Sequence, residues 1–411
     1  MDRRILFLSA LDFKEKSIQV LRNTPEAYAA AGWETNYLVA RDTSRMGSYF
    51  YEQEFDPVGV TVTRFPYPLK GLRNVAGKTL VGTVVTKLAT LLVVVRLAVI
   101  GARILREKDF DVIYGYEVHG VLALGLLRLL RRTGWKATVT RFQGSHMMGF
   151  IESRRWLKLL LNFDHLIALR LASDLCIMTD DGTRGDLLIR SLNPKAHARL
   201  RFWTNGVARF TLNRNDRERL RQAYDLDRKF VLLSVSRLEQ WKRVDRSIRA
   251  LARLDQRGLA EEIVYLIVGE GTRREAWSNL AKSLGIANRV RFIGAVPHEE
   301  VEAYFVMSDL FLSTYDSSNV GNPLLEAVRA GKPVITLDNG DTGRWIEHEV
   351  NGLIFPPVPD PMEAIADGIE RIRQDSELRE RLERGMAATE DRLWTWGERM
   401  QAEIDAVRAL L

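Results

Sequence analysis

The feature that most constrains the fold of this chain is a repeated alternation of short, apolar, β-rich runs with longer helical patterns. Unbroken apolar strands separated by helices are typical of parallel sheets that are covered on both faces. The sequence therefore predicts an α/β protein. The runs that predict strands are ILFLS from Ile5, DVIYGY from Asp111, ATVTRF from Ala137, LCIMT from Leu175, FVLLSVS from Phe230, IVYLIVG from Ile263, VRFIG from Val290 and LFLST from Leu310.

The length of 411 residues is too great for one ordinary hydrophobic core and favours two domains. The alternation breaks in a polar, strongly charged stretch, NGVARFTLNRNDRERLRQAYDLD, which reads as a linker with a boundary near Phe210. We therefore expect domains over 1–210 and 211–394. A terminal helix over 395–411 can pack back on the first domain, although the spacing of its apolar residues, Met400, Ile404, Val407 and Leu411, does not say where it packs.

Charge and cysteine content limit the partners and the compartment. The formal net charge of +7 favours anionic partners, which include nucleic acid, a membrane surface and phosphorylated substrates. The basic residues are scattered without an RNA- or DNA-binding motif, so we expect no nucleic-acid partner. Cys176 is the single cysteine, which excludes a disulfide framework and fits a cytoplasmic protein. The first apolar stretch is interrupted by Asp12 and Lys14 and predicts a core strand rather than a signal peptide.

The most apolar segment is KLATLLVVVRLAVIGARILR, from Lys87 to Arg106. Its basic residues leave no charge-free run of the roughly 18 residues that a bilayer span needs. At helical spacing Arg96, Arg103 and Arg106 lie on one face. A second face contains the apolar residues Leu88, Leu91, Leu92, Val95 and Val99. Two interpretations stay open, a helix packed on the first sheet, which we favour, and a helix lying in the interface of a membrane.

The loop after the strand at Phe230 carries two cations. Arg237 and Lys242 stand five residues apart in VSRLEQWKRVD, where a parallel sheet opens at its carboxyl edge. Arginine can chelate two phosphate oxygens and lysine supplies a point charge, so the pair suits a diphosphate. The alternative is that both are ordinary surface charges.

A second group of residues lies in YDSSNVGNPLLEAVRAGKPVIT, which begins at Tyr315. Asn322 predicts an N-cap, Pro323 the first helical position and Gly331 the end of a helix. Gly321 lets the backbone approach a ligand, and the helix amides and dipole form a phosphate site. Glu326, one turn into the helix, either accepts hydrogen bonds from ribose hydroxyls or is a solvated carboxylate.

In this order, SVSRLEQWKRVD, YLIVGEGTRREAWSNLAKSLGIANRVRFIGAVPHEEVEAYF, SNVGNPLLEAVRAGKPVI and NGLIFPP resemble the donor domain of glycosyltransferase family 4. The resemblance covers most of residues 200 to 400. It implies the GT-B architecture, in which two Rossmann-like parallel-sheet domains face each other across a cleft, and a retaining sugar transfer.

The resemblance also implies roles for particular residues. Arg237 and Lys242 would hold the donor diphosphate, Glu326 the nucleotide ribose, and amides near Gly321 and Asn322 the phosphate. The same donor site would take in Asn319 and, in the loop 295–297 near the base, Val296.

The sequence departs from the family pattern at two positions. Ser318 stands where the first of two glutamates usually contacts the transferred sugar, and Asp316 is a candidate to replace part of that role. Gln143 stands where members often carry a histidine, and His119 and His146 are further candidates for proton handling. A lone histidine is more often structural.

We therefore expect a retaining, metal-independent hexosyltransferase without a cofactor. Its donor would be a UDP- or GDP-linked sugar, and its acceptor a lipid-linked molecule, a glycan or another cell-envelope component. The basic, apolar N-terminal half suits a peripheral location on an anionic membrane surface. The alternative is an inactive GT-B relative that binds nucleotide or glycan as a scaffold.

Overall fold

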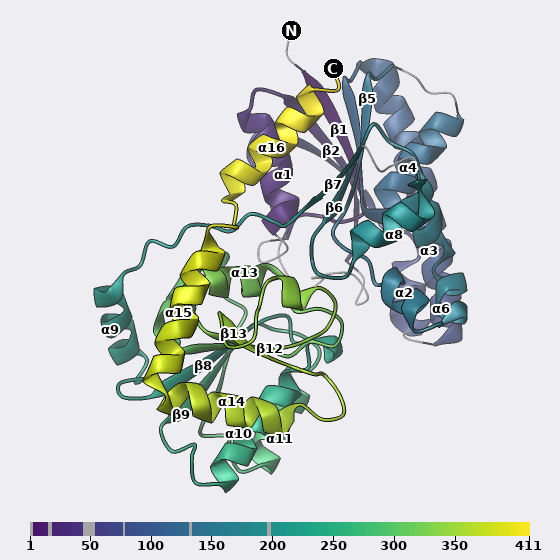
Figure 1. Cartoon of the computed structure of the whole chain (residues 1–411). Helices are drawn as coiled ribbons and strands as arrows, with labels where there is room; N and C mark the ends of the chain where they lie inside the picture. The colour runs from purple at the N-terminus through teal and green to yellow at the C-terminus, as the bar shows by residue number, and fades with distance from the viewer. Residues whose placement is uncertain (1–2, 15–18, 44–53, 77–78, 131–133, 195–198) are drawn as a thin grey trace. The chain divides into compact units, whose positions relative to one another are not determined.

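A computed structural model describes residues 3–14, 19–43, 54–76, 79–130, 134–194 and 199–411 (Figure 1). The contacts divide the chain into two compact units. Unit 1 consists of Met1–Asp180, Arg184–Asn205 and Trp396–Leu411, and unit 2 of Asp181–Thr183 and Gly206–Thr395. Each unit has its own parallel sheet, so the predicted α/β class with two Rossmann-like sheets is confirmed.

Unit 1 contains a seven-stranded parallel sheet in the order β3-β2-β1-β4-β5-β6-β7. The four predicted apolar runs form β1, β4, β5 and β6 in its centre. The neighbouring strands β2, β3 and β7 escaped prediction because polar residues interrupt them. The bounds are β1 Arg4–Ser9, β2 Glu34–Arg41, β3 Val60–Pro66, β4 Val112–Tyr116, β5 Ala137–Phe142, β6 Leu175–Thr179 and β7 Leu200–Trp203.

Helices cover both faces of this sheet (Figure 1). Apolar residues of α1 and α16 pack with one face, and those of α3 and α4 with the other. The bounds are α1 Gln19–Ala30, α2 Lys70–Ala76, α3 Leu80–Glu107, α4 Glu117–Leu129, α5 Met147–Glu152, α6 Trp156–Leu161, α7 Phe163–Arg170, α8 Gly185–Leu192 and α16 Trp396–Arg408.

Helix α3 packs on the sheet of unit 1, as the favoured interpretation predicted, but the predicted apolar face is not the buried one. Leu88, Leu91, Val95 and Val99 are exposed. The buried side consists mostly of smaller residues, Ala89, Val93, Val94, Leu97, Ala98 and Ala102. The helix is apolar on more than one side, so periodicity could not choose the buried face, and small side chains let it approach the sheet closely.

The terminal helix α16 packs on unit 1, where Met400, Ile404 and Val407 join the core beside α1. Leu411 lies beyond the helix and is 38% exposed, so its predicted place on the apolar face was wrong. Beneath α16 the fully buried carboxylate of Glu403 accepts hydrogen bonds from Arg141 at 2.9 Å and Arg399 at 3.0 Å. This charged cluster fixes the helix on β5.

Unit 2 contains a six-stranded parallel sheet in the order β10-β9-β8-β11-β12-β13. Its strands include all four runs predicted after the linker, and β12 follows the helix predicted to end at Gly331. The bounds of the strands are β8 Phe230–Val235, β9 Ile263–Val268, β10 Val290–Gly294, β11 Leu310–Ser313, β12 Val334–Leu337 and β13 Gly352–Phe355. The helices are α9 Arg214–Ala223, α10 Val244–Gln256, α11 Arg274–Ser283, α12 His298–Met307, α13 Asn322–Arg329, α14 Met362–Gln374 and α15 Ser376–Glu390, with short 3-10 turns η2 Gln240–Lys242 and η3 Thr342–Arg344.

The charged stretch that the sequence suggested as a plain linker contains helix α9. Asn213 begins it with a capping box, in which its side chain accepts from the backbone N–H of Asp216. Arg217 and Arg221 of α9 pair with Asp309, which joins the helix to unit 2. The charges that suggested a solvated linker therefore make specific ion pairs.

Candidate active site

The loop between β8 and η2 places the two predicted cations around one aromatic ring. The ammonium of Lys242 lies 4.1 Å from the ring centroid of Trp241, and the guanidinium of Arg237 lies 6.0 Å from the same ring. Lys242 also lies 3.5 Å from the ring centroid of Tyr315. Cations are attracted to aromatic faces, so these rings hold Lys242 in place.

Two glycines that the sequence analysis did not single out shape this loop. A Cβ at Gly269 would lie 1.9 Å from the carbonyl oxygen of Ser236, and one at Gly271 would lie 2.6 Å from that of Leu238. Only glycine lets the segment after β9 pass this close to the backbone on either side of Arg237. The signal was present in the sequence as the GEG run after the strand.

Burial lowers the pKa of Lys242 well below its usual value, and the neighbouring positive charge of Arg237 lowers it further. A lysine in these surroundings gains most from a ligand of opposite charge. A bound diphosphate would supply that charge to both cations.

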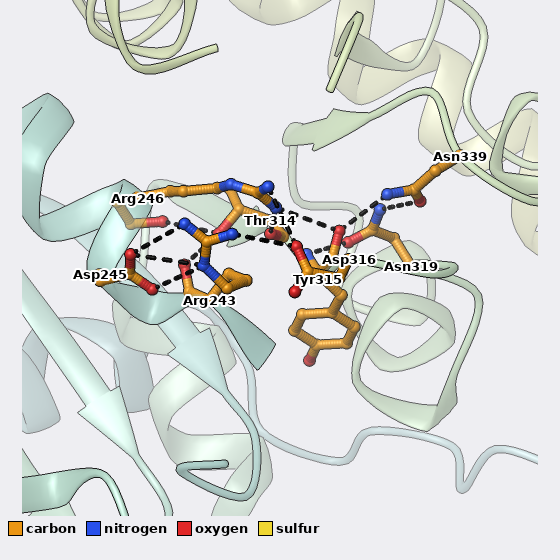
Figure 2. Close-up of polar contacts among 9 residues, drawn as sticks. Arg243, Asp245, Arg246, Thr314, Tyr315, Asp316, Asn319 and Asn339 are labelled. Atoms are coloured by element: carbon orange, nitrogen blue, oxygen red, sulfur yellow. Dashed lines mark hydrogen bonds and ion pairs between the residues drawn. The ribbon is translucent and has the colours of Figure 1, made fainter. Parts of the chain in front are cut away.

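The loop after β11 contains four of the predicted residues, and its side chains are largely engaged within unit 2 (Figure 2). The carboxylate of Asp316 pairs with Arg243 at 3.1 Å and with Arg246 at 3.0 Å. Asn319 is buried, accepts from the hydroxyl of Ser313 and donates to the side-chain oxygen of Asn339 at 2.8 Å. Both residues therefore fix the shape of the loop.

Ser318, which stands at the position of the family's first glutamate, is also buried. Its hydroxyl donates to the carbonyl of Asp181 at 2.8 Å and accepts from the N–H of Val320 at 3.1 Å. A Cβ at Gly182 would lie 2.2 Å from this hydroxyl. The structure therefore gives Ser318 contacts with backbone groups, in a space that is already closely packed.

Helix α13 begins one residue earlier than predicted. Gly321 is the N-cap and Asn322 the first helical residue, so the assignment of Asn322 as N-cap was wrong. The carbonyl of Gly321 accepts from the N–H of Leu324 at 3.0 Å, which makes Gly321 the point where the chain enters the helix. Gly331, with φ of 62°, ends the helix as predicted. The predicted Pro323–Ala330 bounds therefore shift to Asn322–Arg329.

Glu326 of α13 is 6% exposed, so its alternative interpretation as a solvated carboxylate is wrong. Burial raises its pKa to about 7. His298, at the start of α12 two residues after the half-buried Val296, places its Nε2 3.9 Å from the carboxylate. The sequence analysis missed His298, although it named the preceding loop.

Tyr315 connects the two halves of this candidate donor site. Its ring contacts Lys242. Burial is the main cause that raises the pKa of its hydroxyl, and the negative charge of Glu326 raises this pKa further. Arg237 and Lys242 thus follow β8, and Glu326 lies in α13, which follows the neighbouring strand β11.

The acidity of Glu326 gives a pH-dependent prediction. Its pKa of about 7 in the folded protein exceeds the ordinary value of 4.5, so folding favours the protonated carboxyl group. The stability of the protein is therefore highest below pH 4.5 as far as this group is concerned, and it falls as the pH rises to about 7. Glu326→Gln removes this ionisation. We expect the variant to gain up to about 3 kcal/mol over the wild type above pH 7, since one pKa unit is about 1.4 kcal/mol.

The measurement is urea unfolding of both proteins from pH 4.5 to 8.5. Glu377→Gln in α15 is the control, because this carboxylate is exposed. A constant difference between Glu326→Gln and the wild type across this pH range would contradict a raised pKa at Glu326.

Three predicted residues lie in unit 1. The N–H of Gln143, just after β5, donates to the carboxylate of Glu117 at 2.6 Å, and its amide donates to the hydroxyl of Tyr116. His119 in α4 is half-buried, and its Nε2 is buried without a hydrogen-bond partner among the residues that the structure describes. Burial lowers its pKa to about 4, so the imidazole is uncharged at neutral pH. His146, the third candidate, is exposed just before α5.

Within the described ranges, no three histidine, cysteine, aspartate or glutamate side chains gather as metal ligands would.

The whole chain has the fold of known GT-B proteins. It superposes on the Anabaena protein Alr3699/HepE in complex with UDP with a TM-score of 0.71, covering 99% of this chain and 100% of that one at 18% identity. With two parallel-sheet units, the chain has the GT-B architecture that the sequence predicted.

The second unit also matches by sequence. Residues 216–387 match the family described as Glycosyl transferases group 1. Alpha-D-kanosaminyltransferase from Streptomyces kanamyceticus is 30% identical over 40% of this chain and 42% of its own length. A GDP-mannose-dependent alpha-(1-6)-phosphatidylinositol monomannoside mannosyltransferase from Mycolicibacterium smegmatis is 30% identical over 39% of this chain and 47% of its own length. The chain thus matches less than half the length of these relatives.

Proposed function

We propose that this protein is a retaining glycosyltransferase that moves a sugar from a UDP- or GDP-linked donor to a lipid-linked, glycan or other cell-envelope acceptor. The observation that carries the proposal is the placement of Arg237 and Lys242 after β8 and of Glu326 in the helix after the neighbouring strand β11. Two cations suit a diphosphate, and a buried carboxylate suits the paired hydroxyls of a ribose. The domain family and the names of the relatives support the reaction class.

In the proposed reaction, the bond between the anomeric carbon and the diphosphate oxygen breaks, and a bond to the acceptor oxygen forms on the same face of the sugar. The acceptor hydroxyl passes its proton to the departing phosphate. Negative charge develops on the diphosphate, where Arg237, Lys242 and the amino end of α13 stabilise it. No enzyme nucleophile, metal ion or cofactor takes part in this proposal.

The other predicted residues have positioning roles in the proposal. Asp316 and Asn319 hold the loop that leads to α13, and Ser318 packs the same loop. His298 lies beside Glu326 and suits contact with the ribose, and Val296 in the preceding loop suits contact with the base. In unit 1, Gln143 and the uncharged His119 can exchange hydrogen bonds with an acceptor hydroxyl, and a pKa of about 4 makes His119 a weak base.

The choice of donor follows from the relatives alone. One sequence relative is named as GDP-mannose-dependent, and one structure of the same fold was solved with UDP. We therefore propose one of these two nucleotides. The acceptor class rests on unit 1, which lies outside the residues that match the family.

A thermal-unfolding screen with UDP, GDP, ADP and their common sugar conjugates tests the proposal. A nucleotide at 100 times its dissociation constant should stabilise the protein by about 2.7 kcal/mol. We expect one nucleotide class to do so, and Arg237→Ala to lose the effect. Stabilisation by none of them would contradict the proposal, and binding of sugar nucleotides without any transfer to cell-envelope acceptors would favour an inactive scaffold.

A further inference from the structure

Helix α3 leaves a long apolar stripe uncovered. Its outward residues recur at spacings of three and four, and Val81, Val84, Leu88 and Leu91 are between 48% and 66% exposed. An 18-residue window within Val81–Glu107 has a mean hydropathy of 2.2, and within the part of the chain that the structure describes α3 is the helix long and apolar enough to cross a membrane. Its other side is buried in the core of unit 1, so α3 lies on the protein as one element of its surface.

A second exposed apolar group comes from α6 and α7. Trp156, Leu157 and Leu160 are each at least 65% exposed, and Phe163 is 52% exposed. Large apolar side chains in such numbers are unusual on a soluble surface and mark an interaction site. Tryptophan is also typical of the zone between lipid headgroups and acyl chains.

The helices that carry the two apolar groups meet at Lys87. Lys87 of α3 reaches the carboxylate of Asp164 in α7 at 2.6 Å and lies 6.0 Å from the ring centroid of Phe163. Figure 1 also draws α6 at the same end of unit 1 as α2 and α3. We call these residues of α3, α6 and α7 together the α3–α7 surface.

Basic residues outnumber acidic ones in the segment that contributes α6 and α7 to the α3–α7 surface. Residues 154–170 contain the exposed basic residues Arg154, Arg155, Lys158 and Arg170. Their one acidic residue, Asp164, is buried and paired with Lys87. An apolar surface with cations at its edge complements an anionic lipid layer, where acyl chains receive the apolar groups and phosphates receive the cations.

We propose that unit 1 docks on an anionic lipid bilayer through the α3–α7 surface. His119, a candidate for acceptor contact, experiences the charges of Lys87, Asp164 and His165 at this same place. The docked protein would therefore hold its acceptor residues next to the lipid. The inference that the sugar acceptor is a lipid-anchored molecule rests on the proposed function. The docking itself rests on the α3–α7 surface alone.

Sedimentation with vesicles tests the docking. We expect the wild type to bind vesicles of phosphatidylglycerol and phosphatidylcholine at low salt, and to bind phosphatidylcholine alone at least tenfold more weakly. The double variant Trp156→Ser/Leu160→Ser should lose at least tenfold in binding to the anionic vesicles. Arg154→Gln/Lys158→Gln should weaken binding and reduce its dependence on salt.

Val58→Ser is the matched control, because Val58 is 74% exposed on the same unit and lies outside the α3–α7 surface. It should bind vesicles as the wild type does, and all variants should keep the same unfolding temperature. Equal vesicle binding by wild type and the Trp156/Leu160 variant, or no binding by wild type, would overturn the proposal. So would a wild-type dimer that the same variant converts to a monomer, because a second copy would then cover the surface.

Nucleotide binding separates this proposal from the proposed function. The candidate donor site lies in unit 2, so stabilisation by UDP or GDP without vesicle binding would overturn only the docking. Vesicle binding without any nucleotide effect would overturn only the proposed function. If both hold, transfer to a lipid-anchored acceptor in anionic vesicles should fall at least tenfold in the Trp156/Leu160 variant, and unchanged transfer would overturn the lipid-anchored acceptor.

Discussion

Lys242→Met is expected to weaken the binding of a nucleoside diphosphate by about 10- to 100-fold while changing the affinity for the matching monophosphate little. A hydrogen bond to a charged group contributes about 1.5–3 kcal/mol, and each 1.4 kcal/mol is a factor of ten. In the proposed complex Lys242 contacts the diphosphate and not the nucleoside. The substitution therefore removes the part of the affinity that the second phosphate adds.

Calorimetric titration of wild type and variant with the diphosphate and the monophosphate measures this effect. Arg237→Met should behave in the same way. Lys282→Met in α11 is the control, because this lysine is exposed. A uniform loss for both nucleotides would place Lys242 away from the second phosphate, and unchanged binding of both would remove it from the donor site.

Glu403→Ala is expected to destabilise unit 1 by about 3–5 kcal/mol, because removing one partner of a buried ion pair leaves uncompensated charge in the core. Here two buried arginines, Arg141 and Arg399, would lose the carboxylate that both contact. Tyr114, whose hydroxyl donates to Glu403 at 2.8 Å, would lose its acceptor as well.

Urea unfolding followed by hydrogen exchange in β4, β5 and α16 reports on unit 1 separately, since a two-unit protein need not unfold in one step. Asp405→Ala is the control on the same helix, because Asp405 is exposed, and should change stability by no more than about 0.5 kcal/mol. If Glu403→Ala cost no more than Asp405→Ala, the buried cluster would not anchor α16.

The sequence was most informative where local patterns decide the structure. Apolar runs predicted the central strands of both sheets, because a strand covered on both faces has to be apolar along its length. Gly331 predicted the end of α13 through its backbone freedom. Strand β3 was missed because it lies at the edge of a sheet, where alternating polar residues leave no unbroken apolar run.

Contacts between distant residues could not be predicted. Arg141 lies in an apolar strand run, and its partner Glu403 is 262 residues away. Asp316 pairs with Arg243, 73 residues earlier, which no local pattern indicates. His298 reaches Glu326 only because α12 and α13 both begin near this site. A linear pattern contains no information on which distant charges meet.

The most direct test of the donor site is hydrogen exchange of the wild type with and without the nucleotide that stabilises it. The expected result is slower exchange in three segments of unit 2: Val235–Arg243 around Arg237 and Lys242, Gly294–His298, and Ser318–Glu326. Unit 1 should change less. Slower exchange in unit 1 alone, or no change in those three segments despite binding, would contradict a donor site built from Arg237, Lys242 and Glu326.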